Sequence, residues 1–150
     1  MSTHYHGSEQ EIKALDAYIK LSRAAESVNI AVNAHLHQYQ LTVSQFGVME
    51  AIYHLGPLQI GELGQKILKS SGNMTLVIDN LQKRELVQRQ QKENDRRCTE
   101  IHLTEAGTTL IEQILPRHVA QVVETFALLS AEEQTQLGAL CRRLGKQQNR

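Results

Sequence analysis

The sequence predicts a mainly α-helical fold that carries one small β-hairpin. Apolar residues recur at spacings of three and four along most of the chain, as on helices with one buried face. Around residues 86–103 the spacing changes to alternation, and two short strand-like runs flank an entirely polar loop. Neither proline nor glycine occurs between Gly7 and Gly47, so a long first helix can form.

The composition is that of an ordinary globular chain. With 150 residues, 41% of them hydrophobic and 21% charged, we expect one domain that is long enough to bury a core. There is no run of 18 apolar residues and residues 1–10 are polar, so we expect a cytoplasmic protein without membrane contact. Cys98 and Cys141 are too few for a disulfide framework and lack metal-ligand spacing, and no metal or cofactor is expected.

The charges are unevenly distributed, although the net charge is zero. Residues 65–103 hold eight lysines and arginines against five acidic residues, so this segment has an excess of three positive charges. The rest of the chain carries the opposite excess. Such asymmetry is typical of a protein that meets phosphate on one face only.

The first helix is expected from Ser8 to about Gln38. The apolar face of this helix is formed by Ile12, Leu15, Ile19, Ser22, Ala25, Val28 and Val32. A helix of about 30 residues would be about 45 Å long, which exceeds what a small domain needs to cover its own core. Part of it is therefore expected to pack on another chain.

The second helix is expected to begin after Leu41, with Thr42 or Ser44 as its N-cap. Gly56 and Pro57 should end it, because glycine can take the left-handed conformation at a helix end and proline blocks continuation.

The third helix is expected from about Gln59 to Leu68. Gly61 and Gly64 lie within it, although glycine costs about 1 kcal/mol relative to alanine in a helix. We expect these glycines to permit the close helix–helix approach of a helix-turn-helix.

The fourth helix, residues 70–84, has the composition of a helix that reads DNA. Ser70 or Ser71 caps it, and its buried face comprises Met74, Val77, Ile78 and Leu81. Short polar side chains on the opposite face can reach base edges in a major groove, and the helix N-terminus offers N–H groups to phosphate. The candidate DNA contacts on this helix are Ser70, Ser71, Asn73, Thr75, Asn80 and Lys83.

Strands are expected at residues 86–90 and 98–103, with Arg96 and Arg97 at the tip of the hairpin. An arginine at a hairpin tip can enter a minor groove, whose A·T-rich parts carry enhanced negative potential. Asp95 is better suited to hold an arginine by a charge-assisted hydrogen bond, because its charge opposes phosphate. A solvated charged turn is the alternative. Two helices followed by such a hairpin form the layout of a winged helix-turn-helix.

Two helices should follow the hairpin. Thr104 caps the first, and Pro116 is expected to kink or reset it. Ser130 and Glu133 form the capping box of the last helix.

One sequence string resembles the signature of the multiple antibiotic resistance regulator (MarR) family. It comprises Asn94-Asp95-Arg96-Arg97 and, after a short spacer, Leu103-Thr104-Glu105-Ala106-Gly107. Upstream, the segments 71–75 and 81–84 resemble the family's recognition helix, and 56–58 with 63–64 resemble its first helix-turn-helix element. In helix order the resemblance covers nearly the whole chain.

The resemblance implies a cytoplasmic homodimer that binds a pseudo-palindromic double-stranded operator, usually as a repressor, and releases it when a small ligand or an oxidant arrives. It also implies a single domain, 1–150, with a winged helix-turn-helix lobe at 41–104 and dimerisation helices at 8–38 and 108–146. Asp95 would position the wing and Arg97 would enter the minor groove.

The chain departs from the family pattern at two places. Glu85 stands where the family often has glycine after the recognition helix, and no cysteine precedes Cys98, whereas oxidant-sensing members carry one near the N-terminus. Cys98 lies beside two arginines, which would favour thiolate. A thiol-based redox regulator acting through Cys98 is therefore an alternative to a ligand-released repressor.

An effector is expected in a cleft between the dimer helices and the DNA-binding lobe. The candidate wall residues are His35, Tyr39, Phe46, Met49 and Tyr53. These groups suit a phenolic or aromatic acid, and the chain also looks similar to the branch of the family linked to quinone and phenol stress. Alternatively they are ordinary core and surface residues.

An enzyme is not expected, because the sequence holds no phosphate-binding glycine loop, nucleophile motif or helical His-Glu-x-x-His pair. A winged-helix module that binds only proteins remains an alternative, since a fold does not determine a function.

Overall fold

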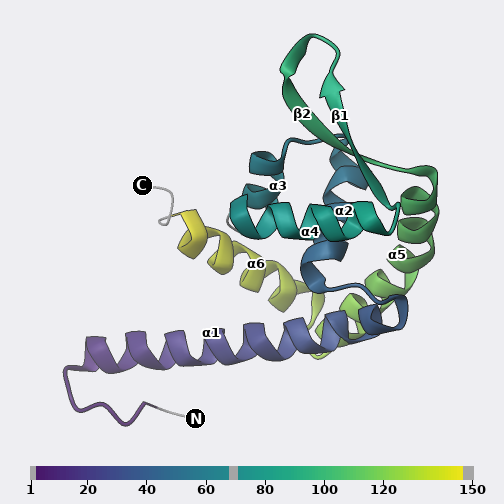
Figure 1. The fold of residues 1–150 in the computed structure, drawn as a ribbon. Coiled ribbons are helices and arrows are strands. Elements are labelled where there is room, and N and C mark those ends of the chain that lie inside the picture. Colours follow the sequence, from purple (N-terminus) through teal and green to yellow (C-terminus); the bar gives the residue numbers. More distant parts are fainter. Residues whose placement is uncertain (1–2, 68–70, 147–150) are drawn as a thin grey trace. The chain divides into compact units, whose positions relative to one another are not determined.

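The computed structural model describes residues 3–67 and 71–146 and confirms the predicted fold class. In chain order its elements are α1 (Glu9–Asn33), the 3₁₀ helix η1 (Ala34–Tyr39), α2 (Val43–Leu55), α3 (Ile60–Ile67), α4 (Ser71–Lys83), β1 (Val87–Lys92), β2 (Asp95–Leu103), α5 (Glu105–Phe126) and α6 (Ala131–Gly145) (Figure 1). No described helix combines the length and hydrophobicity that crossing a bilayer requires.

The chain divides into two compact units. The central unit comprises residues 33–118, and the terminal unit comprises the residues up to Val32 and from Val119 onward. The core of the central unit lies between α2, α3, α4, the start of α5 and the base of the hairpin. Its fully buried side chains are Leu36, Val48, Met49, Leu63, Met74, Ile78, Leu81, Val87, Ile101, Ile111 and Ile114. These residues come from both helices and the hairpin, so one apolar core holds the helix-turn-helix and the wing together.

Several helix ends form where local sequence chemistry predicts them. Thr42 is the N-cap of α2, and a reciprocal capping box joins it to Gln45. Gly56 follows α2 with φ 84° and ψ −176°, a positive-φ conformation that glycine adopts without a steric cost. Ser130 and Glu133 form the predicted capping box of α6.

The first helix is shorter than predicted. α1 ends at Asn33, and the chain continues as η1 up to Tyr39 instead of as α-helix to Gln38. Gln40 then takes a left-handed conformation with φ 53°. Arg84 donates hydrogen bonds to the carbonyls of Tyr39 and Gln40 at 3.0 and 2.7 Å, so a side chain 44 residues away holds this turn.

The close helix approach expected at Gly61 and the reset of the helix expected at Pro116 were wrong. A Cβ added at Gly61 would meet nothing within 4 Å, so close helix approach does not explain this glycine. Pro116 lies inside α5, which runs as one helix from Glu105 to Phe126. A proline removes one backbone donor, and the helix continues because its other hydrogen bonds and its buried face remain.

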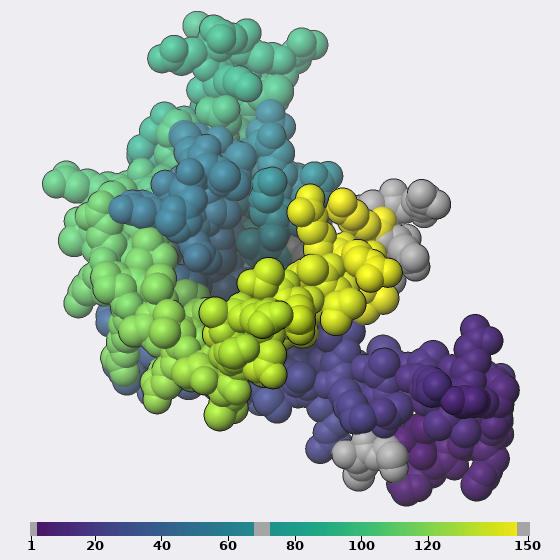
Figure 2. Space-filling view, turned by 180° about the vertical axis from the view of Figure 1, so that it is seen from behind, coloured from purple at the N-terminus to yellow at the C-terminus, as the bar shows by residue number. Residues whose placement is uncertain are grey.

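The hairpin is longer than predicted and carries a bulge. Val87 pairs with Leu103 and Gln91 with Thr99, whereas Lys92 pairs with Asp95, so the extra residues of β2 bulge out between these pairs. At its base, Ile101 exchanges backbone hydrogen bonds with Leu58 at 2.8 and 3.4 Å. The wing therefore projects from the central unit on a base fixed to the segment before α3 (Figure 2).

The terminal unit has little core within one chain. Among its described residues only Val32 is buried, and no residue of α6 is buried. A groove of about 510 Å³ between α1 and α6 is lined by Ala14, Ala17, Tyr18, Leu21, Leu137, Leu140, Cys141 and Leu144.

Candidate nucleic-acid interface

The helix α4 presents a polar face opposite its buried one. Met74, Ile78 and Leu81 are fully buried in the core. The candidate DNA contacts Asn73, Thr75 and Lys83 are exposed and Asn80 is half-buried. Ser70 lies outside the described residues, and so does the side chain of Ser71.

In the wing, one carboxylate holds one arginine. Asp95 Oδ1 accepts hydrogen bonds from the backbone N–H and from Nε of Arg97, both at 3.1 Å. The hydrogen bond from the Arg97 guanidinium is the largest cause of a lowered pKa of Asp95, and the bond from the Arg97 backbone is the second. The carboxylate therefore stays ionised. The Arg97 side chain is nevertheless 91% exposed. Its cation is thus oriented and still available to a phosphate or a groove.

The bulge explains this geometry. Arg96, Arg97 and Cys98 lie between the paired positions Asp95 and Thr99 and have no residue of β1 opposite them. A bulge turns the strand and re-aims its side chains. Arg96 and Arg97 were predicted at the tip of the hairpin, and this was wrong. The tip is the two-residue turn of Glu93 and Asn94, and the arginines follow it in β2. The Cys98 thiol donates to Asp95 Oδ2 at 3.7 Å and so belongs to the same network.

Sequence reasoning missed an ion pair between the wing and α4. Arg89 of β1 donates to Asp79 Oδ1 at 2.7 Å and to Gln82 Oε1 at 2.6 Å. Arg89 lies on β1 and Asp79 lies on α4, ten residues earlier in the sequence. The sequence offered only the opposite charges as a signal, and no helical or strand spacing connects them.

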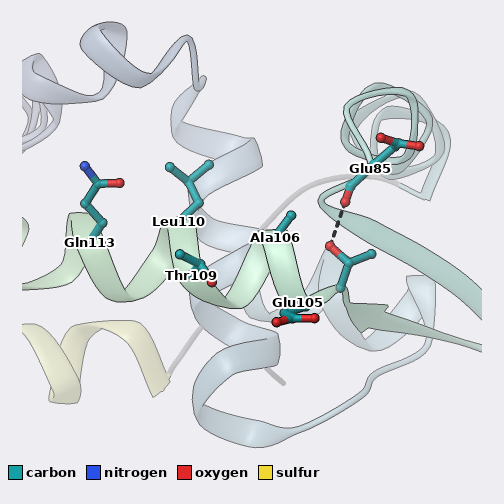
Figure 3. A pocket seen from close by; sticks show the side chains of 7 residues that line it. Glu85, Glu105, Ala106, Thr109, Leu110 and Gln113 are labelled. Carbon is teal, nitrogen blue, oxygen red and sulfur yellow. Dashed lines mark hydrogen bonds between the residues drawn. The ribbon is translucent and has the colours of Figure 1, made fainter.

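Hydrogen bonds of Thr104 to Glu85 and Leu86 join the base of the hairpin to α5, and we call this contact the seam. The Thr104 hydroxyl donates to the Glu85 carbonyl at 2.6 Å, and the Thr104 N–H donates to the Leu86 carbonyl at 3.1 Å (Figure 3). A Cβ added at Gly107 would lie 2.0 Å from the Leu86 oxygen, so only glycine fits there. Glu85 itself is left-handed, with φ 58°. This finding places the helix end directly before Glu85, where the family often has glycine.

An open groove of about 700 Å³ runs along this seam. It is lined by Glu85, Thr104, Glu105, Ala106, Thr109, Leu110 and Gln113. None of the five candidate effector residues lines it.

The candidate effector residues lie mainly in the core. His35, Phe46 and Met49 are buried and Tyr39 is half-buried. Tyr53 is exposed, its hydroxyl donates to Glu112 at 3.3 Å, and the negative charge of that carboxylate raises the pKa of the tyrosine.

A histidine that sequence reasoning missed lies among the candidate effector residues. The His118 ring is 5.3 Å from that of His35 and 4.6 Å from that of Phe46. Burial lowers its pKa, and the negative charge of Glu50 opposes that shift.

Comparison with known proteins agrees with the geometry. A family model described as the MarR family matches residues 41–99. The HTH-type transcriptional regulator MhqR of Bacillus subtilis (strain 168) is 38% identical over 133 residues, which are 89% of this chain and 92% of MhqR. The transcriptional repressor MprA of Escherichia coli (strain K12) is 33% identical over 87 residues, 58% of this chain and 49% of MprA.

Two solved structures share the fold. AbsC, a MarR family transcriptional regulator from Streptomyces coelicolor, superposes with a TM-score of 0.84 at 20% identity, over 97% of this chain and 99% of its own. BpsR of Bordetella bronchiseptica, whose DNA binding is regulated by 6-hydroxynicotinic acid, superposes with a TM-score of 0.78 at 25% identity, over 95% and 98%. The chain therefore belongs to the MarR family of DNA-binding transcriptional regulators.

Proposed function

We propose that this regulator is a homodimeric repressor that a small phenolic, quinone-like or aromatic acid ligand releases from a pseudo-palindromic operator. In each subunit, α4 enters a major groove and Arg97 enters the neighbouring minor groove. The observation that carries the proposal is the Arg97 guanidinium, which Asp95 orients while leaving it exposed. An oriented cation on a projecting hairpin suits the narrow, strongly negative part of a minor groove.

The proposed DNA contacts on α4 are of two kinds, those suited to base edges and those suited to phosphate. Asn73, Thr75 and Asn80 carry groups that pair with base edges, whereas Lys83 carries a charge suited to phosphate. Ser70 and Ser71 would meet DNA at the N-terminus of the helix, where backbone N–H groups also bind phosphate. Arg96 adds a second exposed cation beside Arg97.

A second copy of the chain is proposed to cover the terminal unit. That unit buries one described residue and exposes large apolar side chains, namely Tyr18, Ile30, Val119, Val123, Leu128, Leu140 and Leu144. So small a core cannot offset the conformational entropy of ordering these helices. Association of two copies would bury the apolar surface and set two recognition helices on one operator.

Two relatives support the regulatory part of the proposal. MprA is named a transcriptional repressor, and DNA binding by BpsR is regulated by a small hydroxylated aromatic acid. In this chain the proposed ligand would meet the aromatic and histidine groups around His35, Tyr39 and Tyr53. Since Phe46 and Met49 are buried in the single chain, the ligand must displace core contacts to reach them.

The decisive experiment measures affinity for the duplex most enriched from a randomised double-stranded pool. Arg97→Ala should weaken binding by at least about fivefold, since a groove contact is lost. Arg143→Ala, an exposed arginine on α6 of the terminal unit, is the control. Where sedimentation shows that this variant still forms the dimer, it should bind like the original chain. Unchanged affinity of Arg97→Ala at low salt would leave the protein-interaction module as the better explanation.

The ligand is tested by the same binding measurement. A panel of hydroxylated benzoic acids, phenols and quinones is added to the preformed complex, with aliphatic acids of equal charge as controls. Release by members of the aromatic set alone supports the proposal. Equal release by the aliphatic acids would refute it.

A further inference from the structure

The recognition helix α4 carries an apolar side chain on its outer face. Leu76 is 62% exposed. It follows the fully buried Met74 by two residues, which places it about 200° around the helix and thus opposite the core. Single exposed leucines are common on proteins, so exposure alone means little. The place of this leucine is informative, because the face opposite the core is the one that a groove would receive.

The neighbours of Leu76 leave this face compatible with DNA. Asp79 lies one turn further along and would repel a phosphate or a base oxygen. Its carboxylate is engaged by Arg89 at 2.7 Å, so the pair carries no net charge. Lys83 follows two turns after Leu76 on the same face and is exposed. The face therefore offers an apolar group flanked by polar side chains and a cation, with its one acidic group neutralised.

We infer that Leu76 contacts the C5-methyl group of a thymine in each half-site and so determines sequence preference; this inference rests on the proposed DNA-binding mode of α4. Thymine is the base that displays a methyl group in the major groove, and apolar side chains recognise it by contact. Leucine has no hydrogen-bonding group and cannot read the other base edges. It rejects a polar edge at the same position, because that edge would lose water without gaining a partner.

The test removes the methyl group from the DNA and the side chain from the protein. The duplex most enriched from a randomised pool is synthesised with thymine and again with uracil, which keeps the pairing edge and lacks only the methyl. The original chain should bind the thymine duplex about fourfold tighter for each methyl contacted. Leu76→Ala should bind both duplexes equally, and Leu76→Met should keep the preference.

Leu55→Ala is the matched control, since Leu55 is 57% exposed on α2 of the same unit. It should keep the full preference for thymine. The inference is overturned if Leu76→Ala keeps the full preference for the thymine duplex, or if the original chain binds the thymine and uracil duplexes equally. In both cases the DNA-binding function still stands. Enrichment of no duplex by the original chain would instead overturn the proposed function, and the inference with it.

Discussion

Arg89 of β1 lies 2.7 Å from Asp79 of α4, and this ion pair joins the two elements that are proposed to enter neighbouring grooves. Arg89 also donates to Gln82 one helical turn further along. The wing is therefore fixed to α4 by side chains as well as by the shared core. The two side chains are partly exposed, so the contribution of the pair to the free energy of unfolding is small.

For this ion pair we predict a small coupling in stability and a larger one in DNA affinity. Asp79→Asn, Arg89→Gln and the double variant form a cycle in which the coupling free energy of unfolding is about 0.2–1 kcal/mol. Urea unfolding and duplex binding measure both quantities. If Arg89 acts by positioning, the double variant should bind DNA no more weakly than Arg89→Gln. Additive losses would indicate that each residue contacts DNA separately.

Gly107→Ala should destabilise the protein by about 1–3 kcal/mol, because its Cβ would overlap the Leu86 oxygen. Gly61→Ala is the matched control. A Cβ there meets nothing, and alanine is the better helix former, so stability should rise by up to about 1 kcal/mol. Thermal unfolding of the two variants should move in opposite directions. A similar shift for both would show that local packing at Gly107 is not the cause.

Glu85→Gly should stabilise the protein by about 0.5–1 kcal/mol. The left-handed conformation at φ 58° strains any residue with a Cβ, and glycine relieves that strain. Glu85→Ala removes the charge but keeps the Cβ, so it should give no such gain. An equal gain from alanine would assign the effect to the charge.

Acid should weaken the fold through His118. Burial lowers the folded-state pKa of His118 from its ordinary value of 6.5, so the fold favours the neutral ring. The stabilisation is present above pH 6.5 and is lost as the pH falls through the lowered pKa. Urea titrations between pH 7.5 and about 5 should show this slope in the original chain and less of it in His118→Gln. Ile114→Val, a buried change on the same helix, should lower stability and keep the slope.

Binding to the enriched duplex should weaken steeply with salt, because phosphate contacts release counterions. Arg97→Ala should reduce the magnitude of the slope of log affinity against log salt by about one for each contact removed. The Arg143→Ala control should keep it. A slope near zero for the original chain would contradict phosphate binding altogether.

Local chemistry made much of this fold predictable. Thr42 with Gln45 and Ser130 with Glu133 satisfy helix N-termini within four residues of sequence, so periodicity and capping sufficed there. The core face of α4 followed from spacing alone.

The features that were missed are non-local. Arg84 holds the turn at Tyr39 across 45 residues, and no periodic pattern signals it. The bulge before Thr99 depends on the register between β1 and β2, which no local spacing in the sequence reveals. The pairing of Arg89 with Asp79 needed the hairpin folded back on α4.

The seam at Thr104 has a mechanical consequence. Its hydroxyl and N–H bind the last carbonyls before β1, and Gly107 lets α5 lie against the Leu86 carbonyl without a gap. The first turn of α5 and the residues before β1 are thus joined by two hydrogen bonds and by close backbone packing. If the first turn of α5 rotated, the hairpin attached to it would rotate as well. Because Arg97 lies near the far end of the hairpin, the same rotation would displace Arg97 further than it displaces the base of the hairpin.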